Sequence, residues 1–287
     1  MKKVLLFSLA FLCLLSCKKQ VVPLPDNTDP VDTPPPVDPP PTDSVAFTPF
    51  LQRVKIKFNP THADSAILQL PARYNAASER QQRYPLLVFL NGVYEGSNYG
   101  TLRKMMRLGP PKFMADSMRF SFDAGGKTHH YIVVCPQSTH GFRLPITTDQ
   151  IITYMIANYR VDTTRIYLTG LSAGATSVFK YLTHKPEYAQ RIAAAVPMST
   201  TTLDSASRAQ LRYINQANVP LLMYCGNQDG AYLKVNKAYA ATINAVTPGL
   251  AEFRTYNGKH QNWNPMYNPT HQFYKPNMYE WLLQFKN

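Results

Sequence analysis

The sequence predicts an α/β fold in which helices cover both faces of a mostly parallel, eight-stranded sheet. Short apolar runs alternate with helix-compatible segments along the chain, which is the pattern of a parallel sheet flanked by helices. Most of these runs are continuously apolar, as strands buried on both faces are. The 287 residues are 45% hydrophobic and 16% charged, a composition typical of a packed globular protein.

Eight segments are predicted as strands. The first, residues 53–58, alternates apolar and polar side chains with the period of two expected of a half-buried strand. The second, residues 66–71, is expected to pair with it in the antiparallel sense. The other six are expected at residues 85–90, 131–135, 165–169, 193–197, 220–225 and 252–256. Helices are predicted near residues 101–118, 149–160, 174–184, 205–217, 233–246 and 272–285.

Residues 1–17 have the pattern of an export signal. Two lysines precede an apolar run at residues 4–15 that is too short to span a membrane stably. The run ends in Leu14-Leu15-Ser16-Cys17, which resembles the lipobox of bacterial lipoproteins, in which the cysteine is acylated and becomes the first mature residue. We therefore expect an exported lipoprotein, anchored by lipid on Cys17 to the cell envelope on its periplasmic or cell-surface side. The alternative is an ordinary signal peptide with a chance cysteine.

Residues 18–45 are predicted to be a linker, and residues 46–287 a folded domain. Nine prolines fall between residues 21 and 44, among Asp and Thr, a composition that favours extended polyproline II and suits a tether. About 240 residues remain, enough for one single-core domain.

The chain is basic, with a formal net charge of +13, and five of its 17 acidic residues lie in the linker. One interpretation is a solvated surface beside an anionic membrane; the other is a preference for a polyanionic substrate such as a uronate-bearing glycan. The basic residues are scattered and accompany no recognition motif, which argues against a nucleic-acid partner. The sequence carries no indication of an oligomeric state.

Two cysteines, Cys135 and Cys225, belong to the domain. The expected topology places them on strands four positions apart, roughly 19 Å at about 4.8 Å per strand. A disulfide requires Cα atoms within about 7 Å. We therefore predict two buried free thiols at strand ends.

The motif Gly170-Leu171-Ser172-Ala173-Gly174 directly follows a predicted strand and precedes a predicted helix. A sharp strand-to-helix turn forces its central serine into strained dihedrals and leaves no room for side chains at the two glycines. The serine would lie at a helix N-terminus, where backbone N–H groups favour developing negative charge. Ser172 is thus the candidate nucleophile of an elbow formed with Gly170 and Gly174. The alternative is a serine-rich loop at a helix start.

A serine nucleophile requires a base, and in folds with this motif the chain order is nucleophile, acid, histidine. Asp229 follows the seventh strand, and His260 follows the eighth. Asp204 is a rival acid after the sixth strand, and His271 is the runner-up base. Asp229 could instead cap the next helix.

The oxyanion of a tetrahedral intermediate needs N–H donors. We expect the backbone N–H groups of Ala173, next to the nucleophile, and of Val93, in the loop after the third strand, where Gly92 permits close approach. No metal site is predicted: His129-His130 has nothing nearby to complete a ligand set, and we expect it in a surface loop.

Several blocks, in order, resemble a group of secreted bacterial α/β-hydrolases known as predicted peptidases or phospholipase/carboxylesterases, similar to feruloyl esterases and polyhydroxybutyrate depolymerases. These blocks are YPLLVFLNG (84–92), LGPPK (108–112), YIVVCPQ (131–137), RIYLTGLS (165–172), HQNW (260–263) and YEWLL (279–283). The resemblance runs from about residue 50 to the C-terminus. It implies the α/β-hydrolase fold and a triad of Ser172, Asp229 and His260.

Three departures from that group concern the substrate more than the chemistry. Its His-Gly after the third strand is Asn91-Gly92 here, and its Ser-Met-Gly-Gly elbow is Ser172-Ala-Gly-Ala175. Residues 138–142 replace an expected tryptophan.

The sequence hypothesis is hydrolysis of carboxylic esters through an acyl-enzyme, without metal or cofactor, on a small-molecule or polysaccharide ester such as a glycan-linked acyl or feruloyl ester. The 18 Tyr and 14 Phe could line a feruloyl pocket but equally suit core packing. The alternatives are a serine peptidase acting on small peptides and a non-catalytic, glycan-binding surface lipoprotein.

Overall fold

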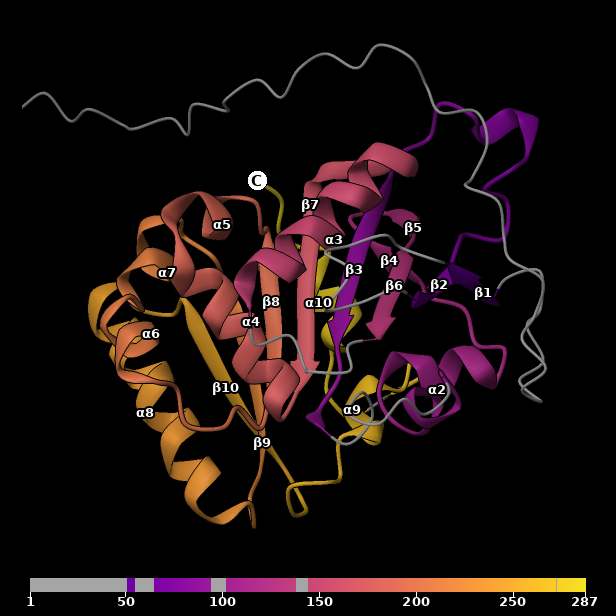
Figure 1. Ribbon diagram of the computed structural model, residues 1–287. Coiled ribbons are helices and arrows are strands. Elements are labelled where there is room, and N and C mark those ends of the chain that lie inside the picture. Colours follow the sequence, from indigo (N-terminus) through magenta and orange to yellow (C-terminus); the bar gives the residue numbers. More distant parts are fainter. Residues whose placement is uncertain (1–50, 55–64, 94–101, 138–143, 272) are drawn as a thin grey trace, which may run out of the picture. The chain divides into compact units, whose positions relative to one another are not determined.

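A computed structural model describes residues 51–54, 65–93, 102–137, 144–271 and 273–287, which belong to the unit Val31–Asn287 (Figure 1). The predicted signal segment, Cys17 and the linker lie outside the described residues. Among the described residues, no helix is long and apolar enough to cross a membrane.

An eight-stranded sheet forms the centre of the domain, and its strands align as expected for the predicted class. Their order is β1 (Leu51–Val54), β2 (Ser65–Gln69), β6 (Ile132–Gln137), β3 (Tyr84–Leu90), β7 (Val161–Leu171), β8 (Ala194–Met198), β9 (Leu221–Gly226) and β10 (Ala251–Tyr256). β2 pairs antiparallel with β1 and β6, and all pairs from β6 to β10 are parallel. The predicted mostly parallel, eight-stranded sheet is confirmed.

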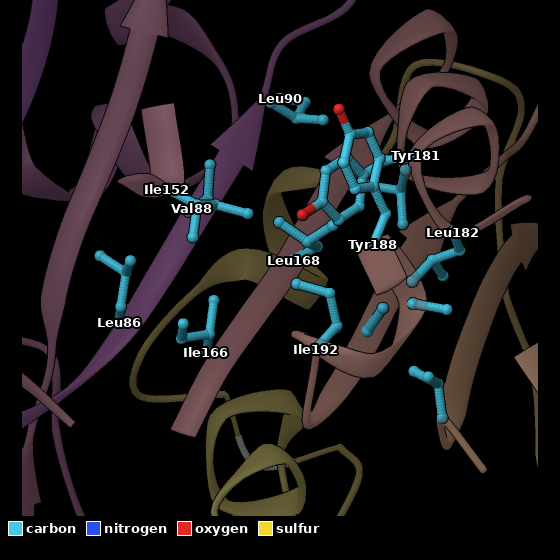
Figure 2. Close-up of a cluster of buried hydrophobic side chains, with 14 of the residues drawn as sticks. Leu86, Val88, Leu90, Ile152, Ile166, Leu168, Tyr181, Leu182, Tyr188 and Ile192 are labelled. Atoms are coloured by element: carbon cyan, nitrogen blue, oxygen red, sulfur yellow. The ribbon is translucent and has the colours of Figure 1, made fainter. Parts of the chain in front are cut away.

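The sheet buries both of its faces. Side chains alternate along each strand, so Leu86, Val88 and Leu90 of β3 join one core while Leu87 and Phe89 join the other. All five are at most 1% exposed. Figure 2 shows part of the first core, where aliphatic side chains of β3 and β7 lie with aliphatic and tyrosine side chains of the helices that cover this face. Burial on both faces explains why these strands read as continuous apolar runs.

Different elements cover the two faces. The first core is covered by α3 (Pro145–Asn158), α4 (Ala173–His184), α5 (Pro186–Gln190), α7 (Arg212–Gln216) and α8 (Gly230–Val246), with α6 (Ser205–Ala209) against α4. The second is covered by α2 (Pro110–Ala115), α9 (Asn264–Tyr267), α10 (Met278–Leu282) and a hairpin of β4 (Ser121–Ala124) and β5 (Lys127–His130). Short 3-10 helices lie at Ala77–Glu79 and Leu102–Arg107.

The β4–β5 hairpin differs from the sequence expectation. His129 and His130, expected in a surface loop, lie in β5 and are half-buried. Gly125 and Gly126, both at positive φ, make the tight turn between the strands. Each strand has only four residues, most of them polar, so the apolar pattern that revealed the other strands is absent here.

The two domain cysteines are free and buried, as predicted. Cys135 lies in β6 and Cys225 in β9, and the strand order places four steps between them.

The carboxyl ends of the parallel strands meet at one edge of the sheet. The segments that follow β3, β7, β9 and β10 begin at this edge, and they carry Asn91, Ser172, Asp229 and His260 respectively. In open α/β sheets this edge is where ligands bind.

Candidate active site

Ser172 occupies a strained turn between β7 and α4. Its backbone has φ 53° and ψ −118°, outside the regions that residues with a side chain ordinarily adopt. Its N–H donates to the carbonyl oxygen of Met198 (2.9 Å), which ties the turn to the end of β8. The hydroxyl is therefore held at the sheet edge by backbone geometry.

Both glycines of the elbow are required by close backbone contacts. A Cβ on Gly174 would overlap the carbonyl oxygen of Leu90 in β3, and one on Gly170 would lie 2.6 Å from the carbonyl carbon of Gly174. The turn is thus packed against the end of the neighbouring strand, with no space for a methyl group at either position.

A continuous path of hydrogen bonds joins the three predicted triad residues. His260 Nε2 lies 2.9 Å from Ser172 Oγ, and His260 Nδ1 lies 2.9 Å and 3.1 Å from the two carboxylate oxygens of Asp229. Since an ionised carboxylate only accepts, Nδ1 of the imidazole carries the proton toward Asp229 and Nε2 accepts from the serine hydroxyl. The Asp229 side chain is 2% exposed and that of His260 is 28% exposed. The imidazole is thus partly accessible to solvent, whereas the carboxylate is buried.

The rival acid and base lie elsewhere. Asp204 caps α6 by accepting from Ser207 N (2.8 Å) and pairs with Lys180 (3.0 Å). These two partners lower the pKa of Asp204 to about 2. His271 accepts from Tyr274 N (3.3 Å) through Nε2.

Asp229 does not act as a helix cap. It precedes the first residue of α8, yet its side chain makes no capping hydrogen bond. The geometry directs the carboxylate to His260 instead.

Two aromatic rings enclose His260. The ring of Tyr232, in the first turn of α8, lies 4.7 Å from the imidazole at 34°, and the ring of Trp263 meets it edge-on at 5.0 Å and 78°. Trp263 follows His260 by three residues, a spacing noted in the resemblance above. Nothing in the sequence indicated Tyr232, because it reaches the site only through the packing of α8 against β9 and β10.

The loops that carry Asp229 and His260 are tied to each other. Gln228 N donates to Gly258 O (3.0 Å), and Gly258 N donates to the side-chain oxygen of Asn227 (3.1 Å). A Cβ on Gly226 would overlap the Gly258 carbonyl oxygen, so glycine permits this approach. These contacts set the distance between acid and base.

The two predicted oxyanion donors, Ala173 and Val93, lie in the segments that follow β7 and β3. Ala173 is the first residue of α4, so its N–H is among those that a helix leaves without an internal partner. Val93 follows the end of β3, whose Leu90 pairs with Gly170 of β7, so the two turns start side by side. Val93 is 45% exposed. Residues 138–142, the third departure from the resembled group, lie outside the described residues.

Asn91 holds the turn after β3 that carries Val93. It is 2% exposed, and its Nδ2 donates to the Gly92 carbonyl oxygen (2.7 Å). That carbonyl belongs to the same peptide unit as the Val93 N–H, and in a trans peptide the two point in opposite directions. Holding the oxygen therefore fixes the direction of the N–H.

Within the described residues, no group of three or more His, Cys, Asp or Glu side chains is placed to hold a metal ion. His130 Nδ1 instead lies 2.7 Å from Ser121 Oγ, across the β4–β5 hairpin.

The overall fold is similar to that of solved structures of hydrolases. A thermostable esterase matches with a TM-score of 0.58 at 18% identity, over 83% of this chain and 64% of its own. The feruloyl esterase module from Clostridium thermocellum, solved with sinapinate, gives 0.51 at 15%, over 78% and 88% of the two chains. A fluorophosphonate-binding serine hydrolase of Staphylococcus aureus gives 0.52 at 14%, over 81% and 95%. The chain has the α/β-hydrolase fold.

No protein-family profile and no curated protein matches the sequence. The α/β-hydrolase neighbours share less than a fifth of their residues with this chain, and the chain spans about two thirds of the length of the thermostable esterase. Their likeness establishes the fold, and the activity has to be argued from the side chains at the sheet edge.

Proposed function

We propose that this protein is a serine hydrolase that cleaves carboxylic esters with Ser172 as nucleophile, His260 as general base and Asp229 as the acid that orients the base. The observation that carries the proposal is the unbroken hydrogen-bond path from Ser172 Oγ through the imidazole to the buried carboxylate. The same three roles recur in serine hydrolases of unrelated folds, where they are recognised by geometry.

The reaction has two halves. His260 Nε2 takes the proton of Ser172 as Oγ forms a bond to the ester carbonyl carbon, and the imidazolium then protonates the departing alcohol. Water, deprotonated by the same nitrogen, attacks the acyl-enzyme, and Ser172 leaves with its proton restored. Asp229 holds the imidazole in the tautomer that accepts from serine and stabilises the imidazolium.

The backbone N–H groups of Ala173 and Val93 are proposed to bind the oxyanion of both tetrahedral intermediates. A rigid pair of donors costs no reorganisation as charge develops, and removing one such donor from a hydrolase slows catalysis by about a hundredfold or more. The elbow glycines and Asn91 keep the two turns in place.

We propose an acyl ester of a glycan, of the hydroxycinnamate type, as the substrate class. A feruloyl esterase module solved with sinapinate is among the structural neighbours, and esterases are frequent among them. The basic character of the chain, +13 overall, suits an acidic polysaccharide as the carrier of the ester.

The test is active-site labelling of the full chain with a fluorophosphonate probe, followed by peptide mapping and by assays on methyl ferulate and p-nitrophenyl acetate. We expect labelling at Ser172, loss of labelling and turnover in Ser172→Ala, and wild-type behaviour in Ser205→Ala, an exposed serine on α6. A folded wild-type protein without labelling would overturn the proposal and favour a non-catalytic binding role. Faster turnover of peptides than of esters would favour a peptidase.

We further propose that the protein is an exported lipoprotein, tethered through Cys17 and the proline-rich segment 18–45. The leader holds a second cysteine, Cys13, which provides a matched control. Metabolic labelling with palmitate should be lost in Cys17→Ser and retained in Cys13→Ser. Retention in the Cys17 variant would contradict the lipid anchor.

A further inference from the structure

The carboxylate of Asp229 is almost fully buried and has few donors. Burying an ionised carboxylate is costly unless hydrogen bonds compensate for the lost water. Among the described residues, the donors to its oxygens are His260 Nδ1 and the thiol of Cys225, whose Sγ lies 3.3 Å from Oδ2. Cys225 is 0% exposed. A thiol therefore occupies a place where a stronger donor would be expected.

The thiol accepts from one hydroxyl group, which is in turn hydrogen-bonded to a second. Ser199 Oγ donates to Cys225 Sγ (3.8 Å), and Ser199 Oγ lies 3.2 Å from the Tyr256 hydroxyl. Because the serine proton is directed to sulfur, the tyrosine hydroxyl donates to the serine oxygen. The result is a directed series of donors, from Tyr256 to Ser199 to Cys225 to Asp229.

The three donors of this series lie in, or directly after, neighbouring strands. Ser199 directly follows β8, Cys225 is in β9 and Tyr256 ends β10, and all three are at most 5% exposed. Ser199 follows Met198, whose carbonyl oxygen accepts from Ser172 N (2.9 Å). None of the three donors touches Ser172 or His260 by a hydrogen bond that the described residues show.

Ser199 adopts a backbone conformation that demands a reason. Its φ is 51°, in the left-handed region, and the residue is 0% exposed. Its N–H donates to Tyr224 O (2.7 Å) at the end of β9. A non-glycine residue persists there only when surrounding contacts determine it, and such strain gathers at functional sites. Here the strain places the hydroxyl between the thiol and the tyrosine.

We propose that Cys225, aligned by Ser199 and Tyr256, is a positioning residue that fixes the Asp229 carboxylate and thereby sets the proton affinity of His260. The inference rests on the proposed function of the triad. A donor to the carboxylate disperses its negative charge and weakens its attraction for the imidazolium. The base then remains neutral, and able to accept the serine proton, at lower pH.

The thiol can serve as a permanent donor because it does not ionise. Burial and the neighbouring Asp229 carboxylate raise the pKa of Cys225 to about 12. Burial likewise raises the pKa of Tyr256. The titratable groups around Asp229 in the described structure are thus Cys225 from β9, Tyr256 from β10 and His260 from the loop after it, with Tyr232 of α8 against the imidazole.

The test compares the pH dependence of fluorophosphonate labelling in Cys225→Ala and wild type. The acid limb is the low-pH part of the profile, where the labelling rate falls as the base becomes protonated. Without the thiol, this limb should move up by about one pH unit. Labelling at a pH on the limb then slows about tenfold, while the rates of the two proteins at high pH converge. Cys225→Ser, which restores a donor, should return the limb toward wild type. Cys135→Ala removes the other buried free thiol, on β6, and should leave the limb unchanged.

Two further variants test the direction of the series. Ser199→Ala and Tyr256→Phe should each shift the limb in the same direction by less than Cys225→Ala does. In the Cys225→Ala background neither should add a shift, because the series is already broken. Additive shifts would overturn the proposed path.

The positioning role of Cys225 and the nucleophilic role of Ser172 can be tested separately. NMR of the His260 imidazole protons follows its titration directly and requires no turnover. A midpoint that is unchanged in Cys225→Ala overturns the positioning role, even in an active enzyme. Equal slowing at every pH, with an unmoved limb, overturns it in favour of packing alone. Absence of Ser172 labelling in folded wild-type protein overturns the proposed function, whatever the titration shows.

Discussion

The indole of Trp263 meets the imidazole of His260 edge-on, with ring centroids 5.0 Å apart and an interplanar angle of 78°. Trp263 is 4% exposed and lies in the core on the second face of the sheet. The base of the site is therefore braced by a core residue that is close to it in sequence.

Replacing Trp263 with Ala should remove this brace and leave a cavity. We expect a loss of about 3–5 kcal/mol in the free energy of unfolding, as for other large buried aromatic residues, together with a reduced kcat. Trp263→Phe is the matched variant: the indole N–H has no hydrogen-bond partner among the described residues, so phenylalanine forfeits only volume. Urea unfolding and ester kinetics measure both effects. A phenylalanine variant as damaged as the alanine variant would contradict this explanation.

Replacing Asn91 with Ala should loosen the Val93 N–H. Because the Val93 N–H is proposed to bind the oxyanion of the transition state, we expect kcat to fall about tenfold with little change in KM. Asn158→Ala is the control, since its Nδ2 also donates to a backbone carbonyl, that of Tyr154 in α3 (2.8 Å). Affinity for a boronic acid analogue of the tetrahedral intermediate should fall in the Asn91 variant alone. A rise in KM at constant kcat would argue against the oxyanion role.

Gly174→Ala should damage the fold at the elbow. The added methyl group would overlap the Leu90 carbonyl oxygen, which is backbone and cannot rotate away. We expect a loss of about 3 kcal/mol and no labelling of Ser172. Gly230→Ala is the comparison: no atom lies within 4 Å of its Cβ, and only its φ of 54° opposes the change, at about 1 kcal/mol. Thermal unfolding of the two variants should rank them in this order.

Asp204 should stabilise the fold in a pH-dependent way. Its pKa in the folded protein, about 2, lies below the ordinary 3.8, so its stabilisation is present at neutral pH and is lost as pH falls through that interval. Asp204→Asn keeps the cap on Ser207 N but loses the charge opposite Lys180. We expect a lower Tm for this variant at pH 7, a difference that narrows toward pH 2. A constant difference across this range would exclude the charge as its source.

Much of the fold was readable because its signals are local. Each of the eight predicted strands overlaps one strand of the central sheet. β7 begins four residues earlier than predicted, at Val161, where its side chains become polar. β1 is described only for Leu51–Val54, so the predicted end of that strand lies outside the described residues. The β4–β5 hairpin escaped notice because its strands are short and polar.

Some residues of the candidate site could likewise be predicted from the sequence, and others could not. Ser172, Asp229 and His260 were predictable because each follows a recognisable strand and the motif sets their order, and the structure brings them within hydrogen-bonding distance. Their catalytic roles remain predictions. Nothing in the sequence singles out Ser199, Tyr232 or Tyr256, because they belong to no recognisable motif.

By itself, the sequence determined which segments build the central sheet, which turn carries the candidate nucleophile and which acid and histidine can follow it. Those properties depend on periodicity and on the few residues that a strained turn accepts. Only the tertiary structure decided that Cys225 faces Asp229 and that Tyr232 and Trp263 enclose His260. Such contacts join residues on different strands and helices, and their formation depends on register and packing, which no local pattern of side chains records.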